Sequence, residues 1–199
     1  MKIDNISKRY GRQQVLDGVN LEINPGESVC IAGTNGCGKS TLLKIIAGVI
    51  KADGGNITYG AGNVRIGYVP QESPLIDELT VRDNLKFWFC SGGSRVEKMC
   101  SEGYIGRLDI SSYIDKRVSK LSGGMKKRAS IACACGNNPD ILIMDEPGAS
   151  LDREFKAVIR DFVKAFTGEG GIVLFSSHED AEITMADRIV VLRDGKICV

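Results

Sequence analysis

Residues 33–41 read Gly-Thr-Asn-Gly-Cys-Gly-Lys-Ser-Thr, which matches the phosphate-binding pattern G-x-x-x-x-G-K-[ST] at every position. The glycines allow the backbone to turn its N–H groups toward an anion, and Lys39 adds a positive charge. Ser40 supplies a hydroxyl that can bind Mg²⁺. The pattern predicts a site for a nucleoside triphosphate, formed by Gly33, Asn35, Gly36, Cys37, Gly38, Lys39, Ser40 and Thr41.

Two adjacent carboxylates, Asp145 and Glu146, follow the apolar run 141–144. In an open parallel sheet, functional groups gather at the carboxyl ends of the strands. We therefore expect Asp145 to reach Mg²⁺ and Glu146 to reach the γ-phosphate side of the nucleotide. A solvated strand end is the alternative interpretation, but the intact phosphate loop in the same chain favours the functional one.

Continuous apolar runs at 28–32, 141–144 and 171–175 are typical of parallel strands that are buried on both faces. Helical patterns at 39–47 and 152–166 lie among these runs. The alternation of buried strands and helices predicts an α/β fold with a parallel core sheet.

Turn signals predict two hairpins beside this core. Residues 188–198 are expected to turn at Asp194-Gly195 and to form a terminal hairpin. The glycine-rich segment 54–63, followed by the strand-like segment 64–69, predicts a second hairpin. The first part of the chain is therefore expected to combine antiparallel strands with the phosphate-binding core.

Residues 72–136 carry helical patterns and contain no strand-like run. Thr80 and Asp83 resemble a capping box at the start of one of these helices. The whole chain of 199 residues fits one domain. We expect a nucleotide-binding core of residues 1–71 and 137–199, with a helical subdomain of residues 72–136 inserted in it.

Composition limits the class of protein. The chain has 26 basic and 25 acidic residues, so its overall charge does not favour binding to nucleic acid. Its seven cysteines lack the paired spacing of a disulfide framework and indicate a reducing, cytoplasmic setting. No apolar stretch approaches the roughly 20 residues that a transmembrane helix needs.

The segment Leu121-Ser122-Gly123-Gly124-Met125 precedes a helical stretch and resembles the signature loop of ABC-type ATPases. The other motifs of that family follow in order from Tyr10 to His178, so the chain is identified as a member on almost its whole length. This resemblance implies the P-loop NTPase fold of ABC ATPases, which has a parallel core sheet, an antiparallel β subdomain and a helical insertion. It also implies ATP and Mg²⁺ as ligands.

The resemblance implies a role for each matching residue. Tyr10 is similar to the aromatic residue that stacks on adenine, and Gln71 to the glutamine that senses Mg²⁺ and substrate engagement. His178 resembles the residue that contacts the γ-phosphate. A turn tyrosine, a surface glutamine and a structural histidine are the ordinary alternatives. The implied catalytic residues are Lys39, Ser122, Glu146 and His178, the implied metal-site residues are Ser40, Gln71 and Asp145, and the implied signature contacts to ATP are Ser122, Gly123 and Gly124.

In this family, two cassettes pack head to tail, and the signature loop of one caps the ATP of the other. The resemblance therefore implies a second ABC ATPase domain as partner, in a homodimer or a heterodimer, and a separate membrane permease. Met125 stands where many members have glutamine, and the run Leu-Ser-Gly-Gly-Met-Lys-Lys-Arg resembles the signature of export-type members, which favours export over import. Leu151-Asp152 keeps part of the family's D-loop, whereas Gly148 and Ala149 depart from it. The implied location is cytoplasmic, on the inner face of the cell membrane.

Three successive aromatic residues, Phe87, Trp88 and Phe89, cannot all face one side of a helix. At least one is expected to be exposed, where it could contact a permease; packing in the core is the alternative. Other functions also remain open. A soluble ABC-type ATPase acting in metal-cluster assembly, on nucleic acid or in translation is disfavoured by the near-zero charge, and a non-catalytic nucleotide-gated module by the presence of Glu146 and His178.

Overall fold

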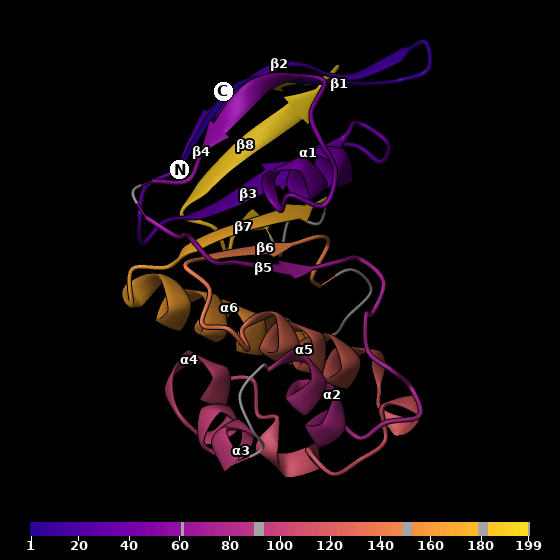
Figure 1. Cartoon of the computed structure of the whole chain (residues 1–199), viewed down its shortest axis with the longest axis vertical. Helices are drawn as coiled ribbons and strands as arrows, with labels where there is room; N and C mark the ends of the chain where they lie inside the picture. The colour runs from indigo at the N-terminus through magenta and orange to yellow at the C-terminus, as the bar shows by residue number, and fades with distance from the viewer. Residues whose placement is uncertain (61, 90–93, 149–152, 179–182, 199) are drawn as a thin grey trace.

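The computed structural model describes residues 1–60, 62–89, 94–148, 153–178 and 183–198. Its layers follow one another along the long axis in Figure 1. A small sheet lies toward the upper end, and helix α1 (Lys39–Ile46) lies beside the upper strands of the central sheet. Helices α5 (Gly123–Ala134) and α6 (Arg153–Gly168) lie below that sheet, and shorter helices form the lower end. The expectation of an α/β fold with a parallel core is confirmed.

The central sheet has six strands in the order β5-β6-β7-β3-β8-β9. The pairs between β5 and β8 are parallel, and β9 runs antiparallel to β8, as the predicted terminal hairpin requires. The strands are β3 (Ser28–Ala32), β5 (Ile66–Val69), β6 (Ile141–Met144), β7 (Ile172–Ser177), β8 (Arg188–Arg193) and β9 (Lys196–Cys198).

The interior strands β3, β6 and β7 are largely apolar because both faces of the sheet are covered. Along β6, Ile141 and Ile143 pack in the cluster that contains α1 and the small sheet. Leu142 and Met144 alternate with them and pack in the cluster that contains α5 and α6. Side chains of a strand point alternately to its two faces, so a continuous apolar run is what a doubly covered strand requires.

The second sheet is antiparallel, with the order β2-β1-β4. Its strands are β1 (Lys2–Tyr10), β2 (Gln13–Glu22) and β4 (Gly54–Thr58). The predicted hairpin across residues 54–69 is wrong, because β4 pairs with β1 while β5 pairs in parallel with β6 in the other sheet. The intervening glycines mark a change of direction, but pairing with distant strands decides the sheet to which each segment belongs.

The helical layer comprises the helices between residues 72 and 136. In its described ranges it contains no strand, only an isolated bridge between Thr80 and Arg117. Thr80 caps α2, because its Oγ1 accepts a hydrogen bond from the Asp83 N–H at 3.1 Å. The elements are α2 (Val81–Trp88), α3 (Ser94–Ser101), α4 (Gly103–Gly106), two 3-10 turns (Ser111–Tyr113 and Val118–Lys120) and α5 (Gly123–Ala134).

Helix α6 (Arg153–Gly168) joins the helical layer to the sheet. The rings of Phe162 and Phe166 each meet that of Tyr104 edge to face, with centroids 5.9 Å and 5.0 Å apart. Such pairs add a specific orientation to the burial of apolar surface. One continuous core therefore runs from the lower face of the sheet into the helical layer.

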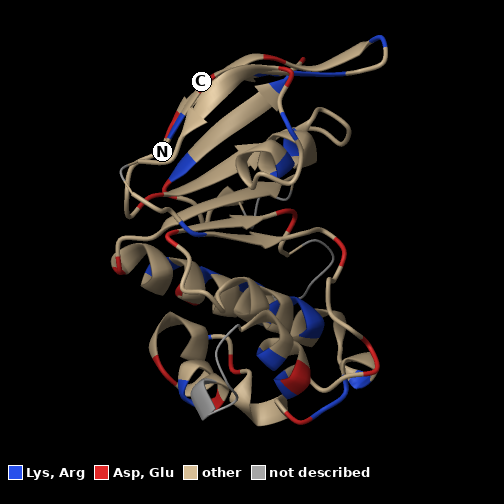
Figure 2. Cartoon of the chain, in the orientation of Figure 1, with Lys and Arg blue, Asp and Glu red and all other residues tan. Residues whose placement is uncertain are grey.

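The surface charges are mixed. Figure 2 shows Lys and Arg together with Asp and Glu in both the upper and the lower layers. Among the described helices, none combines the length and the apolar character that crossing a bilayer demands.

Asp187 links the beginnings of β3 and β8. Its Oδ2 accepts hydrogen bonds from the Ser28 N–H at 2.9 Å and from the Ser28 hydroxyl at 2.5 Å. These bonds hold the pKa of the Asp187 carboxyl below its ordinary value. Because the folded-state pKa is lowered, the stabilisation is complete above the unfolded pKa of about 3.9 and is lost as pH falls through the folded value.

We expect Asp187→Asn to lower the free energy of unfolding by about 1–2 kcal/mol near neutral pH. The difference from the wild type should shrink in acid, where the wild-type carboxyl also becomes neutral. Denaturant unfolding at several pH values measures this, with the exposed Asp161→Asn as a control. A difference that stays constant down to the acid limit would show that the Asp187 charge contributes nothing.

Candidate nucleotide-binding site

The parallel strands place the candidate residues at one edge of the central sheet. The phosphate loop follows β3, Gln71 follows β5, Asp145 and Glu146 follow β6, and His178 follows β7. Because these strands all run in the same direction, their carboxyl ends lie at the same edge. The order of the sheet therefore brings together segments that lie far apart in the sequence.

The phosphate loop bends tightly into α1. Gly38 is the N-cap of α1 and has φ +108°. A Cβ at Gly38 would lie 3.0 Å from Val15 Cγ1, and one at Gly33 would lie 2.6 Å from the Leu192 carbonyl oxygen. Only glycine fits these two positions without displacing the neighbouring strands. The positive end of α1 and the loop amides thus face the space where an anion would bind.

Lys39 is buried, with only 5% of its side chain exposed. Its ammonium group donates hydrogen bonds to the Gly33 carbonyl at 2.8 Å and to the Thr34 carbonyl at 3.1 Å. The ammonium also lies 4.0 Å from Glu146 Oε1. The loop's own carbonyls therefore hold this charge in place beside the carboxylate.

Asp145 is almost fully buried and is bound by two hydroxyl groups. Its Oδ1 accepts hydrogen bonds from Ser40 Oγ at 3.0 Å and from Ser176 Oγ at 2.8 Å. Within the described residues, no basic side chain pairs with this carboxylate, which is only 1% exposed. Burying an unpaired charge is costly, and Mg²⁺ prefers oxygen ligands. The hydroxyl of Ser40 and the carboxylate of Asp145 therefore form a donor set that fits Mg²⁺.

Glu146 has three side chains close to its carboxylate. Gln71 Nε2 donates to Glu146 Oε2 at 3.1 Å. Oε1 lies 3.4 Å from His178 Nδ1 and 4.0 Å from Lys39 Nζ. The backbone of Glu146 has φ +47°, a conformation that residues other than glycine rarely adopt. The Glu146 N–H donates to Ser176 Oγ at 3.0 Å and helps to stabilise this conformation.

A polar cavity of about 430 Å³ lies above these groups. Tyr10, which is half exposed, stands in its wall, and Glu146 and Gln71 line it opposite the phosphate loop. Asp145 reaches the cavity through its contact with Ser40, and His178 through its contact with Glu146. The lining residues are Tyr10, Gln13, Val15, Asn35, Gly36, Gly38, Lys39, Ser40, Thr41, Gln71 and Glu146.

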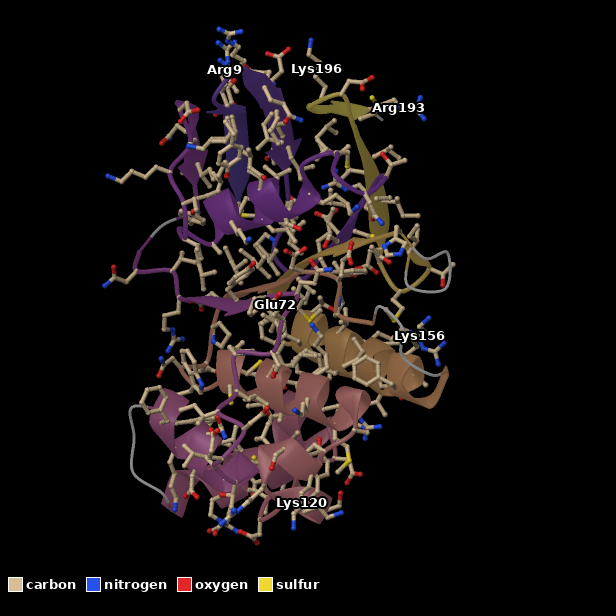
Figure 3. All side chains as sticks on the ribbon, turned by 90° about the vertical axis from the view of Figure 1, so that its right-hand side faces the viewer. Arg9, Glu72, Lys120, Lys156, Arg193 and Lys196 are labelled. Carbon is tan, nitrogen blue, oxygen red and sulfur yellow. The ribbon has the colours of Figure 1, made fainter. Side chains whose placement is uncertain are left out.

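Some predicted residues lie elsewhere. Cys37 lines a neighbouring hollow of about 450 Å³ behind the phosphate loop. Ser122 is the exposed N-cap of α5, with Gly123 and Gly124 in the first turn, and none of them lines the cavity. In Figure 3, Lys120, close to Ser122, is at the lower end of the molecule, whereas Glu72, next to Gln71, is between the layers. Residues 149–152 of the predicted D-loop lie outside the described residues.

The structure adds residues that the motifs did not indicate. Ser176 bonds to both carboxylate residues, and the only signal for it in the sequence is its position at the end of an apolar strand. Gln13 and Val15 line the cavity from β2, where no pattern distinguishes them from other strand residues. Both come to the site through the pairing of β2 with β1 and not through local sequence.

Tyr68 lies on the sheet face that carries Asp145. Its side chain packs in the cluster with α1, and among the described residues its buried hydroxyl has no hydrogen-bond partner. Burial, with a further contribution from the Asp145 charge, raises the pKa of Tyr68 to about 12. The phenol therefore remains neutral at physiological pH and adds no charge to the site.

Comparisons with known proteins agree with this geometry. The family model "ABC transporter" matches residues 16–149. The chain is 33% identical to the linearmycin resistance ATP-binding protein LnrL of Bacillus subtilis, over 99% of this chain and 67% of LnrL. It is 34% identical to the spermidine/putrescine import ATP-binding protein PotA of Spiroplasma citri, over 99% of this chain and 60% of PotA.

A solved dimeric structure of a bacterial ABC transporter cassette superposes on this chain with a TM-score of 0.84 at 29% identity. A solved dimeric cassette in a post-hydrolysis state, bound to ADP and Pi, gives a TM-score of 0.79 at 28% identity. The match covers 98% of this chain and 95% of the solved chain. The similarity extends over the sheets, the phosphate loop and the helical layer together. The chain therefore belongs to the ABC transporter family of ATP-binding proteins and is an ATPase.

Proposed function

We propose that this chain is the ATP-hydrolysing subunit of an exporter, acting on a separate membrane permease from the cytoplasmic side of the cell membrane. The observation that carries the proposed coupling to a permease is the position of the segment after β5. Gln71 lines the nucleotide cavity, and the neighbouring Pro70 and Pro74 line a second hollow on the surface. One short segment thus touches both the ATPase site and a surface suited to a partner.

The proposed chemistry is transfer of the γ-phosphoryl group of ATP to water. Lys39 and the loop amides bind the phosphates, and Glu146 accepts a proton from the attacking water. His178 holds Oε1 of the Glu146 carboxylate and contacts the γ-phosphate. Gln71 holds Oε2 of the same carboxylate. Mg²⁺, held by Ser40 and Asp145, would neutralise phosphate charge.

Ser122 is exposed and does not line the cavity of its own chain, so we infer that a single chain lacks part of this site. We propose a head-to-tail dimer in which the helix N-terminus at Ser122 of one cassette covers the nucleotide of the other. A homodimer is favoured because this chain carries both halves of such a site.

The proposed permease contact is the groove beside Trp88, a hollow of about 360 Å³ between β5, α2 and α5. Phe87 and Trp88 are 67% and 41% exposed, and their rings meet edge to face at 5.7 Å. Phe89 is buried, so the three aromatics divide between surface and core as expected. Exposed aromatic pairs beside an apolar groove are typical of protein contacts.

Export is favoured by Met125 in the signature segment and by the resistance function in the name of LnrL, although PotA is named as an importer. ATP-driven uptake of the transported compound into inverted membrane vesicles would support export. ATP-driven release of preloaded compound from such vesicles would support import instead.

We expect the tagged chain to co-purify from detergent-solubilised native membranes with a polytopic protein in stoichiometric amount. Replacing Phe87 and Trp88 together by serine should abolish this association and leave ATP binding unchanged. The matched control replaces Ile189 and Val191 together by serine and should retain the partner. These apolar residues of β8 are 48% and 37% exposed.

Recovery of a soluble protein or of nucleic acid in place of the polytopic protein would contradict the transporter and favour a soluble ABC-type ATPase. Loss of the partner in the β8 control alone would move the permease contact away from the Trp88 groove.

A further inference from the structure

Lys127 connects the signature helix to the segment that carries Gln71. Lys127 belongs to α5, two helical turns or less from the exposed Ser122. Its ammonium group donates hydrogen bonds to the Pro70 carbonyl at 3.2 Å and to the Gln71 carbonyl at 3.1 Å. Hydrogen bonds from a charged donor are stronger than neutral ones, so two of them hold the segment firmly.

The other end of Gln71 reaches the site. Its side-chain amide donates to Glu146 Oε2 at 3.1 Å, while Oε1 lies near His178 and Lys39. A chain of direct contacts therefore runs from α5, through the backbone and then the side chain of Gln71, to the carboxylate of Glu146.

Helix α5 is also fixed against β5 at a second point. A Cβ at Gly67 would lie 2.5 Å from the Ala134 carbonyl oxygen, so the helix and the strand approach each other very closely there. Lys127 and Ala134 are about two turns apart and thus lie on the same face of α5. The close approach at Gly67 and the ammonium of Lys127 together align α5 along β5 and the segment that follows it.

We propose that Lys127 is a positioning residue for ATP hydrolysis, which fixes the Gln71 backbone so that the Gln71 amide orients the Glu146 carboxylate. This proposal rests on the role proposed for Glu146. If Lys127 has this role, the Glu146 carboxylate is correctly placed only when α5 is in position. The N-terminus of the same helix would cover the partner's nucleotide. Lys127 does not line the nucleotide cavity, so its effect must be on turnover and not on ATP binding.

The adjacent lysine provides a matched control. Lys126 is partly exposed, and its ammonium pairs with the carboxylate of Asp77 at 2.8 Å. Lys127→Met and Lys126→Met each remove one ammonium group from the same turn of α5. Lys127→Arg keeps the charge and can still donate to two carbonyls.

We expect Lys127→Met to lower kcat about tenfold with little change in the KM for ATP. Lys126→Met should behave as the wild type, and Lys127→Arg should recover most of the activity. In a Gln71→Ala background, Lys127→Met should have no further effect, because the side chain that it positions is gone. Multiplicative effects of the two substitutions, or an equal loss in Lys126→Met, would overturn the proposal.

A second measurement is independent of hydrolysis. Hydrogen exchange of the backbone amides of residues 71–73 and 75 should become faster in Lys127→Met and remain unchanged in Lys126→Met. Unchanged exchange in Lys127→Met would show that the two carbonyl contacts do not hold the segment.

The failure of the two proposals can be distinguished. Unchanged turnover in Glu146→Gln with a non-multiplicative Lys127–Gln71 pair would remove Glu146 from the role of base but keep the positioning contact. Loss of turnover in Glu146→Gln together with multiplicative effects of the Lys127 and Gln71 substitutions would keep Glu146 as the base but remove the positioning role of Lys127.

Discussion

Replacing Glu146 by glutamine is expected to lower the ATPase rate by a factor of about 10²–10⁴ without loss of ATP binding. Glutamine keeps the shape of the side chain and can still accept the hydrogen bond from the Gln71 amide, but it cannot take a proton from water. It also removes a negative charge from a wall of the nucleotide cavity, which should favour the bound triphosphate. Steady-state phosphate release and equilibrium ATP binding measure the two effects.

The same variant should accumulate as a dimer when ATP is added, because the nucleotide that joins two cassettes is no longer consumed. Size-exclusion chromatography with and without ATP tests this expectation. The control is Glu72→Gln, which changes an exposed carboxylate in the segment next to Gln71 and should leave both turnover and assembly unchanged. Normal phosphate release by Glu146→Gln would exclude Glu146 as the base.

Replacing Lys39 by methionine is expected to weaken ATP binding about 100-fold, or ~2.8 kcal/mol. The ammonium is held beside the cavity by the Gly33 and Thr34 carbonyls. No other residue of the phosphate loop, 33–41, carries a positive charge. Methionine retains most of the apolar stem and should preserve the fold. Titration with a fluorescent ATP analogue measures the affinity.

Lys44→Met is the matched control, since Lys44 belongs to the last turn of the same helix. It should bind ATP like the wild type. If both lysine variants are folded, as judged by thermal unfolding, and lose ATP affinity equally, the affinity depends on the overall charge of α1. The specific position of Lys39 would then not be the cause.

Local patterns in the sequence were sufficient for the elements that line the site. The loop at 33–41 is recognised from the types and spacing of its glycines and lysine, and the apolar run 141–144 requires cover on both faces. The cap at Thr80 likewise depends only on the residues of the next turn. These predictions held because their physical causes act within a few residues of the chain.

Pairing between distant segments was not available from such patterns. The glycines after β4 indicated a turn. The strand that follows them, β5, instead pairs with β6, and helices α2 to α5 all lie between these two strands in the sequence, so the predicted hairpin was wrong. The contact of Gln71 with Glu146, the two bonds of Ser176 and the reach of Lys127 to the Gln71 carbonyls depend on the same strand order.

The sequence by itself therefore determined which groups could bind phosphate, hold a cation and accept a proton, because residue type and local spacing decide that chemistry. Only the tertiary structure decided which of these groups meet. It gathered the segments after β3, β5 and β6 around one cavity and brought His178, after β7, against Glu146 in its wall. It left Ser122 exposed at the start of α5, outside the lining of that cavity. The reason is that the order of strands in a sheet is set by the burial of both its faces together, which no single segment encodes.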